Sequence, residues 1–233
     1  MKNRNWTKYA FEFLSIFIAV ISAFALNSWN DNRNNRSTER KILTEIKNSI
    51  AIDINDFNNN IKGNGRSLRA DEVLRDLIAN KDITQDSIGF YYTALFRDYI
   101  PIINRSAYES FKSNNLKIIS NDSLRLQIIS LYDYYYSIIE ALEYEVQEMK
   151  SYDNYFARIN TLLYPYMRFN PQNGNLIEIK KPEKLTEPQK QEILSYLWRI
   201  RDNRKFKLGR YQVIIKAIKK VEAHIEKELK NKR

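Results

Sequence analysis

The sequence predicts an all-α protein in which an N-terminal transmembrane helix is followed by a mostly antiparallel bundle of long amphipathic helices. Three observations support this fold class. The 233 residues include only five glycines and five prolines, too few for a turn-rich β sandwich. Residues 9–30 form one apolar stretch in a chain that is otherwise polar. Beyond this stretch, apolar residues recur at spacings of three and four, which is typical of one face of a helix.

The apolar stretch at residues 9–30 is expected to be a transmembrane helix. From Tyr9 to Trp29 there are 21 residues, close to the ~20 that cross the hydrocarbon of a bilayer. Both end residues are aromatic, as is common at the two membrane interfaces. The residues expected to line the span are Phe13, Leu14, Ile16, Phe17, Ile18, Val20, Ile21, Phe24, Leu26 and Trp29.

The domain boundaries follow from this stretch. We expect a basic tail at residues 1–8, a polar joint at residues 31–36 and a helical bundle domain at residues 37–233. A cleaved signal peptide and a buried core helix are the alternative interpretations of the apolar stretch. Its length, and the bulky residues at its end, favour an uncleaved anchor. The short basic N-terminus is typical of a signal anchor with the C-terminal part exported.

Glu12 lies at the start of the apolar stretch and has two interpretations. A carboxylate inside hydrocarbon is costly and usually marks an ion or proton path. At the edge of the span, one turn after Lys8, it can instead reach the headgroups. Its position at the edge favours the second interpretation, and Glu12 is kept as a candidate functional residue.

After the polar joint, Ser37 is expected to cap a helix that runs to Lys62. Its apolar residues form one stripe, and Gly63-Asn64-Gly65 is expected to end it as a C-cap and turn. Shorter helices are expected at about 67–80 and 85–98, before Pro101.

The segment from Ser106 to Arg125 is expected to be a structural corner. Ser106 and Glu109 have the spacing of a capping box, in which each side chain bonds the other residue's backbone N–H. Tyr108 and Phe111 lie three apart, so both can face the bundle. The alternative is a partner-binding corner, in which Lys112 and Arg125 make the contacts. This helix is expected to end at 114–115, where two asparagines tolerate left-handed geometry.

The longest helix of the bundle is expected from Asn121 to Pro165. A seven-residue apolar repeat runs through it, with Glu145 as the one lapse, and predicts a coiled-coil-like rod of about 65 Å. A loop at 168–186 with an extended piece at Leu176–Ile179 follows.

A second capping box is expected at Thr186-Glu187-Pro188-Gln189. It starts a helix containing Ile193 and Trp198, and a last helix is expected from about residue 203, with apolar residues inward and lysines outward.

The sequence offers no catalytic motif. There is no cysteine, so thiolate zinc sites cannot be assembled within one chain. His224 is the only histidine, so any histidine-based triad would have to use this residue. No P-loop or G-x-S-x-G motif is present. We therefore expect a non-enzymatic protein with no cofactor and no metal. His224 is expected at the surface or rim.

Two clusters of chemically capable residues are expected to be structural. The glutamates of the long helix are expected to form a solvated face (Glu140, Glu143, Glu145 and Glu148). Tyr132 and Tyr135 are expected in the core and Tyr134 at the surface, without a nucleic-acid signature.

Residues 199–233 hold 13 lysines and arginines against 4 acidic residues. Such a basic end can contact anionic lipid, nucleic acid or an acidic partner, although a solvated helix face is the simpler interpretation.

Two blocks resemble an uncharacterised family of small single-span membrane proteins of Bacteroidota, known as domain of unknown function 6090. The first block is Glu12, the apolar run and Asn27-x-Trp29-Asn30. The second is Tyr108-Glu109-Ser110-Phe111-Lys112-Ser113, with Leu116, Ile119 and Leu124-Arg125 after it. This chain has Asn114-Asn115 where the family tends to have a glycine. The resemblance implies a bacterial inner-membrane location with a single pass, but no activity.

The first functional hypothesis is therefore a membrane-anchored, non-enzymatic interaction or scaffold module, with its C-terminal domain in the periplasm. Its partners would be the bilayer and either a protein or further copies of itself. The second hypothesis is an ion-coupled, stator-like or channel-accessory subunit that uses Glu12. The third is a basic, membrane-tethered nucleic-acid binder, which the absence of a binding signature makes the weakest.

Overall fold

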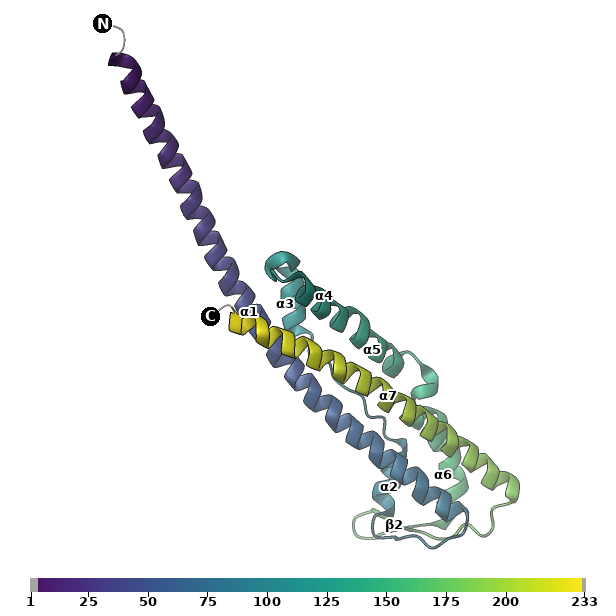
Figure 1. Cartoon of the computed structure of the whole chain (residues 1–233). Coiled ribbons are helices and arrows are strands. Elements are labelled where there is room, and N and C mark those ends of the chain that lie inside the picture. Colours follow the sequence, from purple (N-terminus) through teal and green to yellow (C-terminus); the bar gives the residue numbers. More distant parts are fainter. Residues whose placement is uncertain (1–3, 232–233) are drawn as a thin grey trace.

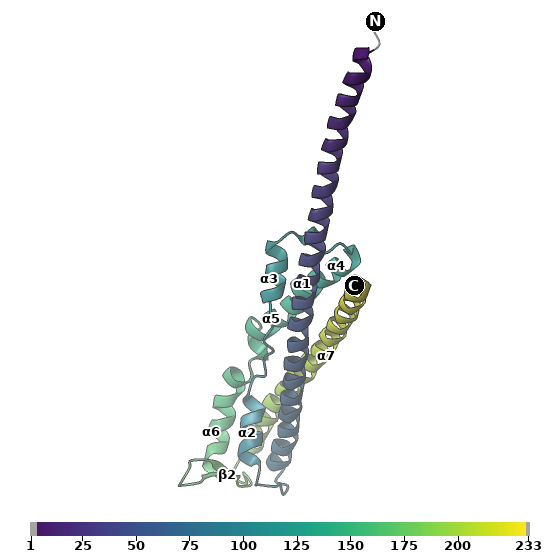
Figure 2. The ribbon, with the colours of Figure 1, turned by 90° about the vertical axis from the view of Figure 1, so that its left-hand side faces the viewer.

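The computed structural model describes residues 4–231 and shows an elongated, mainly helical molecule (Figure 1). The helix α1 (Arg4–Ile78) has 75 residues, and α7 (Glu187–Asn231) has 45. The first part of α1 projects from the rest as a single rod, and its second part lies beside α7 (Figures 1 and 2). We call residues 38–231 the helical body. Of the expected basic tail, residues 1–3 lie outside the described part of the chain.

The two long helices run antiparallel within the helical body. Lys47 of α1 forms an ion pair of 2.7 Å with Glu226 near the end of α7. Further along α1, Ser67 accepts a hydrogen bond from Arg204, on the first half of α7. The shorter α-helices cover one side of this pair (Figure 1) and are α2 (Ile88–Phe96), α3 (Ser106–Ser113), α4 (Asp122–Ser130), α5 (Ser137–Tyr144) and α6 (Ala157–Leu163).

The continuity of α1 corrects three expectations. Residues 31–36 are helical and exposed, so they are no joint; Ser37 is no N-cap, and the turn expected at 63–65 does not exist. Gly63 serves close packing, because a Cβ at this position would overlap the ring of Tyr99. Asn64 is fully buried, and its amide donates to the carbonyl of Asn60 within the helix at 2.9 Å. The glycine therefore allows a neighbouring chain segment to approach without ending the helix.

The prediction of one continuous helix from 121 to 165 is wrong. It is interrupted at Glu145, the lapse in the repeat, where α5 ends and a 3₁₀ turn follows (η3, Gln147–Met149). Two π-helical turns also occur, η2 (Leu131–Tyr136) and η4 (Tyr152–Phe156). A π turn holds one extra residue, so it rotates the inward face of the helix that follows.

This rotation changes which side chains are buried after η2. The buried residues are Tyr136, Ile139 and Glu143, each one position beyond the expected Tyr135, Ile138 and Leu142. Tyr135 is half-buried rather than in the core. Tyr132 is buried and Tyr134 exposed, as expected.

The expected extended piece is confirmed as β2 (Leu176–Ile179). It pairs antiparallel with β1 (Met167–Phe169), which the sequence did not indicate, with Arg168 opposite Glu178. The remaining short turns are η1 (Leu116–Ile118) and η5 (Tyr164–Tyr166).

The capping box at Thr186 is confirmed. The Thr186 N–H donates to the side-chain oxygen of Gln189 at 2.9 Å, and the Gln189 N–H donates to Thr186 Oγ1 at 3.4 Å. The two helices expected after it are one helix, α7.

Two separate hydrophobic cores lie along the α1–α7 pair. The proximal core, nearer the projecting part of α1, includes Ile46 and Phe57 of α1, Tyr108 and Phe111 of α3, and Tyr132 of η2, together with the second half of α7. The distal core joins the last turns of α1, residues 70–78, to α2, α6, β2 and the first half of α7. Between the cores, both long helices turn polar residues inward.

The two glycines of α1 give a matched test of this packing. Gly63→Ala should destabilise the protein, because its Cβ would displace the Tyr99 ring. Gly65→Ala should stabilise it by about 1 kcal/mol, because Gly65 is exposed with open space around it and alanine favours helix. Thermal melting of both variants checks this. Destabilisation by Gly65→Ala would mean that α1 does break at 63–65.

Candidate functional site

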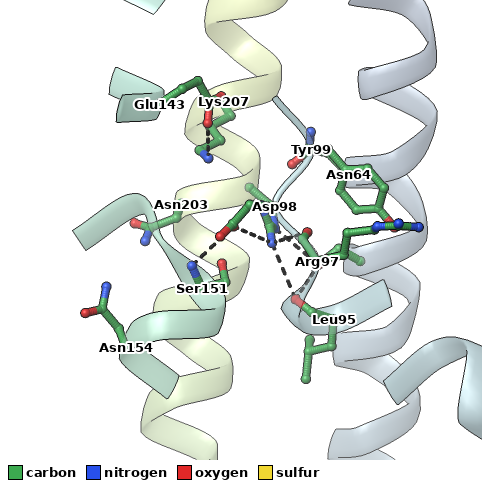
Figure 3. A network of polar contacts seen from close by, with 12 residues as sticks. Asn64, Leu95, Arg97, Asp98, Tyr99, Glu143, Ser151, Asn154, Asn203 and Lys207 are labelled. Carbon is green, nitrogen blue, oxygen red and sulfur yellow. Dashed lines mark hydrogen bonds and ion pairs between the residues drawn. The ribbon is translucent and has the colours of Figure 1, made fainter. Parts of the chain in front are cut away.

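The most distinctive internal feature is a polar layer between the two cores (Figure 3). On α7, the apolar inward positions Ile200 and Tyr211 are separated by three buried polar residues, Asn203, Arg204 and Lys207. The residues that make up the layer are Asn64, Ser67, Asp98, Glu143, Ser151, Asn203, Arg204 and Lys207. They come from α1, the segment after α2, the end of α5, the break at 145–151 and α7.

Arg204 is the centre of this layer and is fully buried. Its Nη2 donates to the carbonyl of Arg97 at 2.8 Å and lies 3.3 Å from Asp98 Oδ1. Its Nε donates to Ser67 Oγ at 3.2 Å. An arginine in this position satisfies carbonyls left free where α2 ends and interacts favourably with the helix dipole. Arg204 therefore joins α7 to α1 and to the chain after α2.

A second buried group contains Glu143, Lys207 and Tyr211. Lys207 Nζ lies 2.6 Å from one Glu143 oxygen, and the Tyr211 hydroxyl donates to the other at 2.6 Å. Burial, and then the charge of Glu143, raise the pKa of Tyr211 well above its ordinary value. The tyrosine therefore stays neutral and acts as a donor. Glu143 was expected on a solvated face, but it is 3% exposed and belongs to this group, because the π turn η2 rotates α5.

The layer also stabilises the break in the chain after α5. Asn203 donates to the carbonyl of Glu148 at 2.6 Å, and the Ser151 N–H donates to Asp98 at 3.2 Å. A cavity of about 250 Å3 opens beside this break, lined by Asp98, Ile100, Glu143, Tyr144, Met149, Lys150, Asp153 and Lys207. Glu143 is already neutralised by Lys207, and the described residues hold no group of three or more acidic or histidine side chains that could bind a metal. The arrangement is suited to holding chain segments together.

The candidate residues of the expected corner divide between the core and its surface. Tyr108 and Phe111 are buried, and the Tyr108 ring stacks on Tyr132 at 4.3 Å between centroids. The capping box predicted at Ser106 is wrong. The N-cap of α3 is Arg105, and Ser106 Oγ donates a hydrogen bond to the side-chain oxygen of Asn104. Ser106 is already the first residue of α3, so it does not hold the N-cap position that a capping box requires.

The polar candidates of this corner have contacts within the chain. Lys112 lies 3.9 Å from Asp133 and over the Tyr108 ring. Arg125 donates to the Ile119 carbonyl at 3.0 Å and pairs with Asp122. Glu109 lies in the first turn of α3. The helix ends at Ser113, and the expected left-handed end is absent, since Asn114 has a φ of −79°.

Glu12 and the apolar residues lie on the projecting part of α1. Among the described residues, α1 is the one helix long and apolar enough to cross a membrane, and its most apolar window is not buried at all. The backbone carbonyl of Glu12 accepts from Ser15 Oγ at 2.9 Å. The apolar residues expected in the span are all exposed, from 48% for Val20 to 71% for Phe24.

One surface that the sequence reasoning missed is the outer face of α7. Trp198, Phe206 and Val213 are exposed by 52%, 40% and 47%, and Gly209 between them has open space where a Cβ would be. Their spacings of eight, three and four place them on one stripe, opposite the buried side of the helix. We call these four residues the outer face of α7.

His224 lies half-buried at the rim, 3.1 Å from Gln127.

Comparisons with protein-family models, curated proteins and solved structures found no match.

The contribution of the buried ion pair between Lys207 and Glu143 to stability can be tested by substitution. Lys207→Met should lower the free energy of unfolding by about 3–5 kcal/mol, because it leaves Glu143 buried without a counter-charge. Adding Glu143→Gln should recover part of this loss. Lys205→Met, on the exposed side of the same helix, is the control and should have little effect. Chemical denaturation measures all three, and an equal effect of the Lys205 and Lys207 substitutions would contradict the assignment.

Proposed function

We propose that this protein is a single-span membrane protein whose helical body is a non-enzymatic interaction or scaffold module. Its location would be the inner membrane of a bacterium. The body would lie in the periplasm, with the basic residues Lys2, Arg4 and Lys8 on the cytoplasmic side of the span. The resemblance of its two sequence blocks to the Bacteroidota family is consistent with this location.

The observation that carries the proposal is the uninterrupted α1. Its first part exposes a continuous series of large apolar side chains that contact no other described part of the chain. Burial of each such side chain away from water is favourable by about 1.5–3 kcal/mol. This surface is therefore expected to be covered by an apolar environment. Lipid fits, because the segment has the length of a hydrocarbon span and a helix satisfies its own backbone groups.

Because α1 continues into the core of the helical body, the body is held at a fixed height and rotation relative to the span. A flexible joint would allow the body to turn freely. Such rigid attachment suits a scaffold that presents one surface at a set distance from the membrane.

The outer face of α7 supports a role in binding a partner. It combines Trp198 and Phe206, residue types enriched at interaction surfaces, with a glycine that allows close approach. A glycine within a helix costs about 1 kcal/mol relative to alanine, and the fold of this chain gives Gly209 no packing role. The ion-coupled alternative has less support, since Glu12 lies at the edge of the proposed span, where its carboxylate can reach the headgroups. The nucleic-acid alternative has less support, since no binding signature accompanies the basic residues of 199–233.

The anchor is tested by membrane fractionation. Intact protein should stay with the membrane pellet after carbonate and high-salt washes. Ile18→Asp with Ile21→Asp should release it, because each acidic residue near the centre of a span costs about 2.5–3.5 kcal/mol of insertion. The control is Ile52→Asp with Leu126→Asp, which changes two exposed apolar residues of the helical body. Recovery of the unaltered protein in the soluble fraction would contradict the anchor.

The interaction role is tested by photo-crosslinking in native membranes. A photoreactive residue in place of Phe206 should give one discrete heavier species, because the outer face of α7 would be covered by its partner. The same residue in place of Phe90, which is 54% exposed on α2, is the control. Equal labelling from both positions, or none from either, would contradict a partner on this face.

A further inference from the structure

The end of the helical body that faces the projecting part of α1 contains a hollow of about 850 Å3. Three chain segments form it: α1, the connection between α3 and α4, and the end of α7. These segments lie together where α1 leaves the body (Figures 1 and 2). The lining residues are Asn32, Asn35, Arg36, Glu39, Asn115, Lys117, Ile118, Ser120 and Asn231.

The height of this hollow matches the headgroup layer of a bilayer. Arg36 follows Trp29, the last residue of the proposed span, by seven residues, which is about 10 Å along a helix. The headgroup region reaches roughly 5–7 Å beyond the hydrocarbon on each side. Side chains of a helix lean toward its N-terminus, so that of Arg36 leans back toward the membrane. A long arginine side chain covers the remaining distance.

The charges of the hollow favour an anionic ligand. Arg36 and Lys117 are both exposed, and within residues 4–231 neither forms an ion pair. The one acidic residue in the lining, Glu39, is only 2% exposed. Its Oε1 accepts from the Ser120 N–H at 2.8 Å and from Ser120 Oγ at 3.1 Å. Glu39 therefore holds the α3–α4 connection against α1, while the two cations remain available.

The asparagines of the lining add neutral donors. The Asn115 side-chain oxygen accepts from the Lys117 N–H at 2.9 Å, which leaves its NH₂ group to donate. Asn32 and Asn35 contribute side-chain amides from α1. A guanidinium, an ammonium and several amides together complement the oxygens of a phosphate group.

We propose that this hollow binds the phosphate of an anionic phospholipid headgroup at the membrane surface. The inference rests on the proposed membrane anchor, because the bilayer supplies such phosphates at this height. A lipid with net negative charge is favoured over a zwitterionic one, since two uncompensated cations face it. Bound lipid would connect the bilayer to the α3–α4 connection and to the end of α7, and so fix how the helical body sits on the membrane.

The test uses the full chain, purified in detergent and titrated with phosphatidylglycerol or phosphatidylcholine of equal acyl chains, with bound lipid counted by native mass spectrometry. Phosphatidylglycerol should be retained in preference, and Arg36→Gln with Lys117→Gln should lower its affinity roughly tenfold. The matched control is Arg66→Gln with Lys184→Gln, which removes two exposed charges that do not line the hollow. Excess inorganic phosphate should not displace the lipid, since it lacks the acyl chains beside the span.

Equal retention of the two lipids, or an equal effect of the two double variants, would overturn the proposal. Displacement by inorganic phosphate would indicate a site for free phosphate and would also overturn it. Melting temperatures of both double variants should match the unaltered protein, because all four side chains are exposed. Carbonate washing of the Arg36/Lys117 variant separates this inference from the anchor: the variant should stay in the membrane even if lipid preference is lost.

Discussion

The burial of Arg204 is the interaction on which the rest of the helical body depends. A guanidinium cannot leave water without partners, and here the partners come from Ser67 of α1, from the carbonyls that end α2, and from Asp98. These contacts are directional, so they fix α7 against α1 in one register, which apolar packing alone does not do. Arg204 Nη1 and Ser151 Oγ have no partner among the described residues, so the layer specifies the arrangement at some cost in stability.

The second constraint is that α1 serves both the proposed span and the helical body. A helix that crosses a membrane must satisfy its backbone internally, and α1 keeps that property for its full length. Its polar stretch at 31–36 remains helical because it needs no tertiary partner to do so, and both ends of the stretch already belong to a helix. The lipid site proposed beside Arg36 depends on this continuity, since a flexible joint would leave the position of the hollow relative to the proposed span undefined.

Much of the fold was predictable, because the periodicity of apolar residues reflects the local secondary-structure preference of the chain. The all-helical class, the apolar segment, β2 and the cap at Thr186 depend on neighbouring residues and were identified from them. The capping box predicted at Ser106 is absent, because α3 begins at this residue and the N-cap position falls on Arg105. The polar layer has a signal in the sequence: Asn60, Asn64 and Ser67 on α1, and Asn203, Arg204 and Lys207 on α7, lie at helical spacing and are all buried. No sequence pattern indicates the hollow near Arg36, because the three segments that line it are distant in the sequence.

The sequence by itself determined which segments are helical and which one is apolar enough to enter a membrane, since both are set by side chains close together in the chain. Only the tertiary structure decided where those helices end and which faces they bury. Gly63 lies inside α1 and makes room for the ring of Tyr99, which is thirty-six residues away in the sequence. Glu143 turns inward because a π turn rotates α5 and because Lys207 and Tyr211 stabilise its charge. Such contacts join residues far apart along the chain, so no local pattern contains them.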